Sequence, residues 1–183
     1  MGNHAALFRK GNTMKKRLFA ILLIALLLCG CGSGKTETTE PARNAAPDFT
    51  CYDIDGNAHT LSEFAGKPVV LNFWASWCGP CKSEMPDLEA AYKKYGEEIH
   101  FIMVNLTDGQ SETVQTASAY IAGQGYTFPV YYDTDMSGAM AYKVTSIPIT
   151  YFIDAQGNIV AYASGMMSAS RLQNGINLLL DEA

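Results

Sequence analysis

The amino-acid sequence predicts an α/β sandwich in which helices flank a mixed central β-sheet. Between residues 68 and 132, short apolar runs alternate with amphipathic segments of helical period, an order typical of parallel strands joined by helices. Near the C-terminus, two strand-like runs flank a turn segment and precede a last helix, which adds antiparallel strands to the sheet. The chain has 183 residues, 48% of them hydrophobic, enough for one packed domain with additional segments.

Residues 1–30 have the pattern of a secretory signal peptide. The basic patch Met14-Lys15-Lys16-Arg17 precedes eleven apolar residues, 18–28. As a helix these eleven would span roughly 17 Å, well short of a hydrocarbon core of about 30 Å. The pattern therefore favours a cleaved signal peptide over a permanent membrane helix. Because the patch begins at Met14, we expect Met14 to be the true start of the protein.

The segment Leu28-Cys29-Gly30-Cys31 resembles the lipobox of bacterial lipoproteins. In that family the peptide is cut before the cysteine, so the resemblance implies a diacylglyceryl group on the thiol of Cys31. A plain secreted protein and an uncleaved anchor are the alternatives. Residues 32–46 are rich in Gly, Ser, Thr and Glu without apolar periodicity, which predicts a flexible tether with a reach of about 20 Å. We thus expect a lipid-anchored domain on the extracytoplasmic face of a bacterial cell membrane.

The folded domain is expected from residue 47 to residue 183 and begins with a predicted β-hairpin. Residues 49–54 and 58–61 are strand-like and flank the turn signal Asp55-Gly56-Asn57. Residues 68–73 form an apolar run suited to a strand buried on both faces, and residues 78–95 repeat apolar side chains at helical spacing. The remaining elements are predicted as strands at 99–106, 128–132, 149–153 and 159–163, and as helices at 111–122 (ended by Gly123 and Gly125), 136–142 and 170–180.

Charge argues against nucleic acid as a partner. From Cys31 onward there are 8 Lys and Arg residues against 18 Asp and Glu residues. An acidic body of this kind repels polyphosphate, and its basic residues form no stripe along a predicted element.

The motif Trp77-Cys78-Gly79-Pro80-Cys81 lies where a buried strand meets a helix. At a helix N-terminus the unpaired backbone N–H groups and the dipole favour a thiolate. Cysteines so placed have pKa values of about 3.5–7.5 instead of about 8.5. The two-residue spacer lets the two sulfurs close a small disulfide ring. We expect Cys78 to attack a partner disulfide and Cys81 to resolve the mixed disulfide, without a cofactor.

Residues 72–82 resemble the active-site strand and loop of the thioredoxin superfamily. The fuller pattern resembles its membrane-tethered TlpA/ResA-like branch of thiol-disulfide oxidoreductases. This likeness implies a thioredoxin fold with an N-terminal β-hairpin and an inserted helix between about residues 105 and 128. Further segments that match the pattern of this branch are residues 46–49, 81–86, 128–130 and 146–154.

The resemblance also implies a substrate-binding loop. In this family the proline that matches Pro148 is cis and faces the cysteine pair. The backbone of the preceding residue, Ile147 here, pairs with an extended substrate segment. Trp77 stands beside the nucleophile and is expected to line the docking face, the alternative being that it packs the end of the sheet.

Asn72 departs from the thioredoxin pattern. Thioredoxin has a buried Asp at this position, which moves the proton of the resolving cysteine, and an amide cannot titrate. Glu84 lies one turn after Cys81 and matches a glutamate of the ResA-like branch. We therefore expect Glu84 to relay the proton; the alternative is an ordinary glutamate on the helix surface.

The function implied by the resemblance is reduction of protein disulfides outside the membrane by a monomeric enzyme. A membrane thiol transporter of the CcdA type would resupply the electrons. Candidate clients are apocytochrome c, extracellular methionine sulfoxide reductases and other secreted disulfides. An oxidase that uses the same pair in the opposite direction is the main alternative. A thiol peroxidase and a non-catalytic binding lipoprotein are weaker ones, because the pattern Pro-x-x-x-Thr-x-x-Cys of peroxidases is missing and the Cys-x-x-Cys pair is intact.

The remaining chemistry-bearing residues receive ordinary roles. Half of a zinc site is an alternative for the cysteine pair, but the domain sequence offers no second Cys pair, so no metal is expected. Cys51 alternates with Phe49 and is expected to be a core side chain instead of a third redox thiol. His59 and His100 show no acidic or Cys partner nearby in the sequence and are assigned no function.

Overall fold

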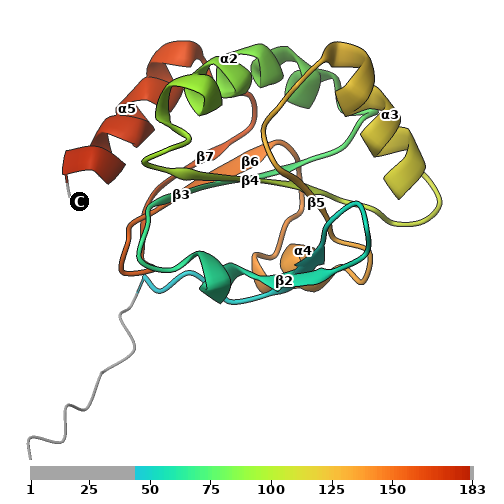
Figure 1. The fold of residues 1–183 in the computed structure, drawn as a ribbon, viewed down its shortest axis with the longest axis horizontal. Coiled ribbons are helices and arrows are strands. Elements are labelled where there is room, and N and C mark those ends of the chain that lie inside the picture. The colour runs from blue at the N-terminus through green and yellow to red at the C-terminus, as the bar shows by residue number, and fades with distance from the viewer. Residues whose placement is uncertain (1–43, 182–183) are drawn as a thin grey trace, which may run out of the picture. The chain divides into compact units, whose positions relative to one another are not determined.

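A computed structural model describes residues 44–181, which form a seven-stranded mixed sheet with helices on both of its faces (Figure 1). The strand order is β2-β1-β5-β4-β3-β6-β7, and the sheet contains both parallel and antiparallel pairs, which confirms the predicted mixed sheet. Within residues 44–181, no helix is long and apolar enough to cross a membrane. The predicted signal peptide, the start at Met14 and the lipid site at Cys31 lie outside the described residues.

The elements follow the predicted order, with ends that differ by up to three residues. The strands are β1 (Thr50–Tyr52), β2 (Ala58–Thr60), β3 (Val69–Trp74), β4 (His100–Asn105), β5 (Val130–Tyr132), β6 (Ile149–Ile153) and β7 (Ile159–Ser164). The helices are η1 (Leu61–Phe64, a 3₁₀ turn), α2 (Gly79–Tyr95), α3 (Val114–Gln124), α4 (Ser137–Ala141) and α5 (Ala169–Asp181).

The central strand β3 pairs in parallel with β4 and antiparallel with β6. All six of its residues are buried, which confirms the strand predicted from the apolar run. Asn72 is its single polar residue and is only 1% exposed. A buried side-chain amide needs hydrogen-bond partners, and those of Asn72 belong to the candidate active site described below.

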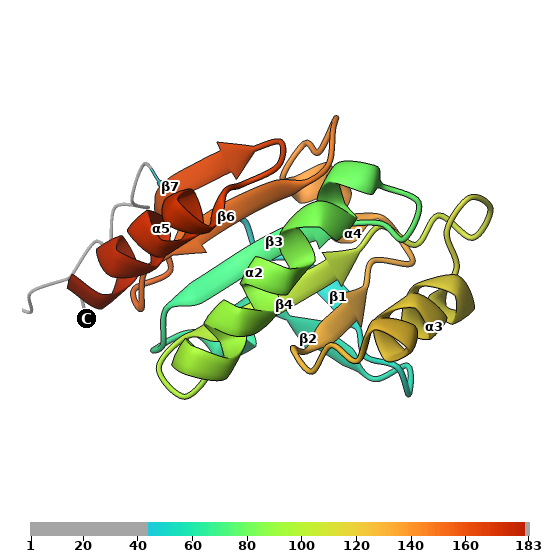
Figure 2. The ribbon, with the colours of Figure 1, turned by 90° about the horizontal axis from the view of Figure 1, so that it is seen from above.

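Two apolar layers hold the helices against the sheet. One layer joins α2, α3 and α5 to one face, and Figure 2 shows α2 and α5 lying over the sheet, roughly along the direction of its strands. The other layer lies on the opposite face and gathers Phe49, Leu61 and Tyr142 under β3. Close approach depends on glycine: a Cβ at Gly175 of α5 would lie 2.2 Å from the Phe152 ring of β6.

Capping explains why the inserted helix is shifted from its predicted range. The α3 helix begins after Thr113, whose side chain accepts from the Thr116 N–H at 3.1 Å, while the Thr116 hydroxyl accepts from the Thr113 N–H at 2.9 Å. This reciprocal cap fixes the start three residues later than predicted. Gly125, at φ +72°, ends the helix, whereas Gly123 lies inside it and does not stop it.

The domain begins earlier than predicted. Residues 44–46 were expected to belong to the flexible tether, but backbone hydrogen bonds hold them against the turn between β6 and β7. The Ala46 N–H donates to the Gly157 carbonyl at 2.9 Å, and the Asn44 carbonyl accepts from the Ile159 N–H at 2.8 Å. These residues therefore extend the edge of the sheet.

Candidate active site

Cys78 and Cys81 form a disulfide at the start of α2. Cys78 has an extended backbone and is the N-cap, with its sulfur accepting from the Cys81 N–H at 3.1 Å. Pro80 occupies the first turn, where its missing N–H removes no helical hydrogen bond. Cys78 is 4% exposed and Cys81 is 0% exposed. Cys78 is therefore the more accessible residue of the pair, in keeping with the roles expected for them.

Glu84 lies inside the domain one turn after Cys81. Its side chain is 2% exposed, so the alternative of a surface glutamate is wrong. Oε1 accepts from Nδ2 of Asn72 at 2.9 Å, and Oε2 accepts from the backbone N–H of Met167 at 2.8 Å. Burial raises the pKa of the Glu84 carboxyl, and the two hydrogen bonds offset only part of this effect.

Asn72 connects Glu84 to the neighbouring strand β6. Its Nδ2 also donates to Oγ1 of Thr150 at 2.9 Å. Its carbonyl oxygen is buried and has no partner within residues 44–181. Rotating the side-chain amide of Asn72 by about 180° exchanges its oxygen and its nitrogen and leaves the volume that it occupies unchanged. With Glu84 protonated, a turned Asn72 would accept from both Glu84 and Thr150, so the same positions suit either protonation state.

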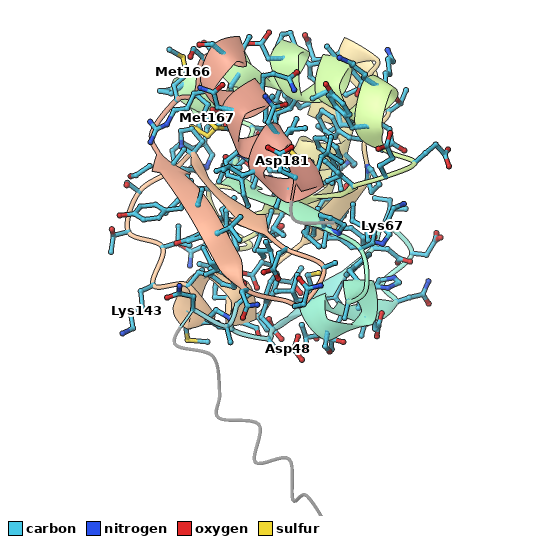
Figure 3. The ribbon with its side chains drawn as sticks, turned by 90° about the vertical axis from the view of Figure 1, so that its left-hand side faces the viewer. Asp48, Lys67, Lys143, Met166, Met167 and Asp181 are labelled. Atoms are coloured by element: carbon cyan, nitrogen blue, oxygen red, sulfur yellow. A yellow bond between two sulfur atoms is a disulfide. The ribbon has the colours of Figure 1, made fainter. Side chains whose placement is uncertain are left out.

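The loop before β6 carries the expected proline. The peptide bond between Ile147 and Pro148 is cis, and the Pro148 carbonyl accepts from the Gly165 N–H at 2.8 Å. This contact places the loop after β7 beside the proline. In that loop Met166 is 57% exposed, whereas Met167 is buried (Figure 3). No sequence pattern pointed to these methionines, because their position depends on how β7 returns along β6.

A surface groove of about 330 Å³ lies beside Trp77, the residue that precedes Cys78. Trp77 forms part of it and is 58% exposed, so the alternative that Trp77 packs the end of the sheet is wrong. Trp74 occupies that place instead and is fully buried. The residues lining the groove are Trp77, Leu106, Val144, Thr145, Ser146 and Ile147. The structure thus brings together Trp77 and Ile147, both predicted to contact the substrate.

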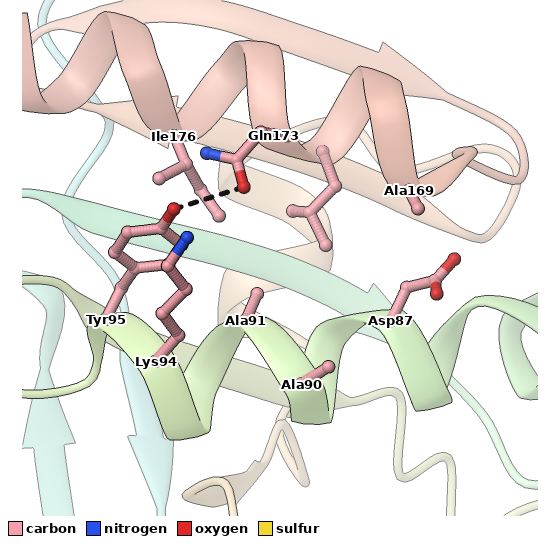
Figure 4. Close-up of a pocket in the computed structure, with 9 residues that line it drawn as sticks. Asp87, Ala90, Ala91, Lys94, Tyr95, Ala169, Gln173 and Ile176 are labelled. Carbon is pink, nitrogen blue, oxygen red and sulfur yellow. Dashed lines mark hydrogen bonds between the residues drawn. The ribbon is translucent and has the colours of Figure 1, made fainter.

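A separate depression of about 180 Å³ lies between α2 and α5 (Figure 4). Tyr95 and Gln173 close one end of it through a hydrogen bond of 3.1 Å between the phenol and Oε1. Neither cysteine lines this depression. The depression lies between two helices and shares no lining residue with the groove beside Trp77.

Cys51 is a core side chain, as expected. It is 1% exposed, and burial raises its thiol pKa to about 12, which keeps it protonated and unreactive at neutral pH.

The expectation that His59 has no acidic partner is wrong. Its ring nitrogens lie 3.4 Å from Asp53 and 3.3 Å from Glu63, because the hairpin and η1 fold these residues around it. Over residues 44–181, no group of three His, Cys, Asp or Glu side chains is placed to hold a metal.

A Cys-x-x-Cys disulfide at a helix N-terminus, a cis proline before β6 and a buried carboxyl in the next turn of the helix together define a thioredoxin-fold thiol-disulfide oxidoreductase. Residues 42–162 match the sequence model of the AhpC/TSA family, and the chain belongs to this family. It is 33% identical to the thiol-disulfide oxidoreductase ResA of Bacillus subtilis over 177 residues, which cover 90% of this chain and 94% of ResA.

Solved structures agree with this assignment. A putative thiol:disulfide interchange protein DsbE from Chlorobium tepidum has a TM-score of 0.66 and 29% identity, covering 75% of this chain and 96% of that one. The pneumococcal exposed lipoprotein thioredoxin Etrx1 from Streptococcus pneumoniae has a TM-score of 0.61 and 30% identity, covering 72% of this chain and 99% of that one. The thioredoxin fold expected from residues 72–82 is confirmed.

Proposed function

We propose that this protein reduces disulfide bonds of extracytoplasmic proteins while it is held at the membrane by lipid on Cys31. The observation that supports it best is a Cys-Gly-Pro-Cys pair at the start of a helix whose next turn carries the buried carboxyl of Glu84. The Gly-Pro spacer is that of reducing thioredoxins. The name of Etrx1, an exposed lipoprotein thioredoxin, supports the anchor.

The reaction starts from the reduced pair. The Cys78 thiolate attacks one sulfur of the client disulfide, and the other client sulfur leaves as a thiolate and takes up a proton. The Cys81 thiol then loses its proton, and its thiolate attacks the Cys78 sulfur. The second client sulfur leaves, so the client gains two electrons and the pair becomes the disulfide seen in the structure.

Glu84 is proposed to accept the proton of Cys81. It lies on the same helix one turn later, and both residues are buried. Bulk water is therefore a poor base for Cys81. A raised carboxyl pKa brings Glu84 closer to the working pH, where a general base is most effective. Asn72 and Thr150 orient the carboxyl in either protonation state.

The partners proposed for this protein follow from the dithiol and the anchor. A client presents an extended segment to Ile147 and Pro148 and fills the groove beside Trp77. Apocytochrome c and extracellular methionine sulfoxide reductases are the candidate clients. A membrane electron donor of the CcdA type reduces the pair again. The enzyme acts as a monomer.

Cell fractionation tests the anchor and the activity together. Membranes from cells that make the full chain are expected to reduce insulin with an added thiol. Cys78→Ser should abolish this activity and leave the protein in the membrane fraction. Growth with labelled palmitate should label the unsubstituted protein and not Cys31→Ser. Membrane-bound protein without this label contradicts the lipid anchor, and activity that survives Cys78→Ser contradicts the proposed nucleophile.

A further inference from the structure

The inserted segment between β4 and α3 holds a buried carboxylate that the reaction does not use. Glu112 is 1% exposed and directly precedes Thr113, the N-cap of α3. Its backbone is fixed by a turn: its N–H donates to Oδ1 of Asp108 at 2.9 Å, and its carbonyl accepts from the Gly109 N–H at 2.9 Å. The side chain therefore projects inward from a rigid base.

The carboxylate of Glu112 binds two segments of chain at once. Oε1 accepts from the backbone N–H of Ser76 at 3.1 Å and from Nδ2 of Asn105 at 3.0 Å. Oε2 accepts from the Ser76 hydroxyl at 2.8 Å. The amide oxygen of Asn105 in turn accepts from the Thr107 hydroxyl at 2.8 Å. Hydrogen bonds to a carboxylate are shorter and stronger than those between neutral groups, so the two segments are held firmly together.

Each segment leads directly into the groove beside Trp77. Ser76 is followed by Trp77, and Asn105 is followed by Leu106; both of these apolar side chains line the groove. The other lining residues, 144–147, come from the loop before Pro148. Glu112 thus fixes the residues that directly precede Trp77 and Leu106, two of the six residues that line the groove, without lining it itself.

We infer that Glu112 is a positioning residue that holds Trp77 and Leu106 in place for a client protein. It raises the affinity for a protein disulfide and takes no part in the exchange of electrons. A client that fills the groove needs both side chains in position, whereas a small disulfide only has to meet the sulfur of Cys78. This inference rests on the groove as the client site, which is part of the proposed function.

The chain offers a matched control in Glu89. This side chain is 7% exposed, and its carboxylate accepts from the Thr127 N–H at 2.8 Å, the Thr127 hydroxyl at 2.7 Å and the Phe128 N–H at 3.3 Å. It therefore secures a loop in the same way as Glu112 does. Thr127 and Phe128 do not line the groove.

Steady-state kinetics with insulin and with hydroxyethyl disulfide, on the full chain, test the inference. Glu112→Ala is expected to raise KM for insulin about tenfold, which corresponds to about 1.4 kcal/mol, and to leave the rate with the small disulfide within about twofold. Glu112→Gln should restore most of the affinity, because its oxygen still accepts from Ser76 and Asn105 and the Ser76 hydroxyl can turn to accept from the amide. Glu89→Ala should leave KM unchanged.

The variant Trp77→Ala distinguishes a failure of the role of Glu112 from a failure of the groove as the client site. If Trp77→Ala raises KM for insulin and Glu112→Ala does not, the role of Glu112 is overturned and the groove remains the client site. If neither raises KM, the groove is not the client site. Should Glu112→Ala fail to fold by circular dichroism, Ser76→Ala decides, since it removes only the hydroxyl contact of 2.8 Å. It should raise KM about threefold, and an unchanged KM contradicts the inference.

Discussion

At the scale of single residues, the carboxyl of Glu84 is the group proposed to take the proton of Cys81. A glutamine at this position would keep the size of the side chain. The Asn72 amide can turn so that its unpartnered oxygen accepts from the new amide, while the Met167 N–H keeps its acceptor. The substitution Glu84→Gln therefore removes the titrating group and preserves the local packing.

We predict that Glu84→Gln slows release of the client by about a hundredfold, in the range typical of a lost general base. In the unsubstituted protein this rate should rise with pH through the raised pKa of Glu84, because only the carboxylate accepts the Cys81 proton. The variant should lose this rise. Stopped-flow measurement of mixed-disulfide resolution between about pH 5 and pH 9 checks the prediction, and identical pH profiles would contradict the relay.

Unfolding by urea provides the control for that experiment. Burial raises the pKa of Glu84 in the folded state, so the folded protein binds the proton more tightly than the unfolded chain does. The contribution of Glu84 to stability should therefore fall as the pH rises from about 4.3, the ordinary value for Glu, through the folded-state pKa. Glu84→Gln lacks this loss, so it should be at least as stable as the unsubstituted protein at pH 7 in spite of its slower reaction.

Residue roles differ in how far the sequence foretells them. The pair Cys78 and Cys81, and the cis bond at Pro148, follow from local motifs. Glu84 and its hydrogen-bond donor Met167 are 83 residues apart in the sequence. Glu112 and its donor Ser76 are 36 residues apart. No local periodicity encodes such contacts, because they depend on how the strands are ordered in the sheet.

At the scale of elements, the packing of α5 on β6 depends on the missing side chain of Gly175. A Cβ there would lie 2.2 Å from the Phe152 ring, closer than any relaxed contact. Helix periodicity predicted α5 and α2 well, since both have one apolar face. Their ends and those of α3 depend on caps such as Thr113 and Gly125, which tertiary context selects.

We predict that Gly175→Ala lowers the free energy of unfolding by about 1–3 kcal/mol, the usual effect of overpacking a core. Gly123→Ala is the matched control, because Gly123 lies inside α3 with nothing within 4 Å of the added Cβ. It should raise the free energy of unfolding by about 0.5–1 kcal/mol through a better helix propensity. Urea denaturation measures both, and equal effects of the two substitutions would contradict this packing.

At the scale of the whole domain, the sheet order gathers the site at one end of β3. The disulfide follows β3, the cis proline precedes its antiparallel neighbour β6, and the inserted segment follows its parallel neighbour β4. Residues 44–46 bind the turn after β6, at the opposite end of β3 from Cys78. The dithiol thus faces away from the point where the chain enters the domain, which leaves it open to a client.

The reduction potential of the Cys78–Cys81 pair tests the proposed direction most directly. Purified protein would be equilibrated in defined thiol–disulfide buffers and the oxidised fraction measured. A potential near or below about −250 mV, close to that of thioredoxin, is the predicted result and identifies a reductant that needs its own electron supply. A potential near about −120 mV would identify a disulfide donor and contradict the proposed reductase.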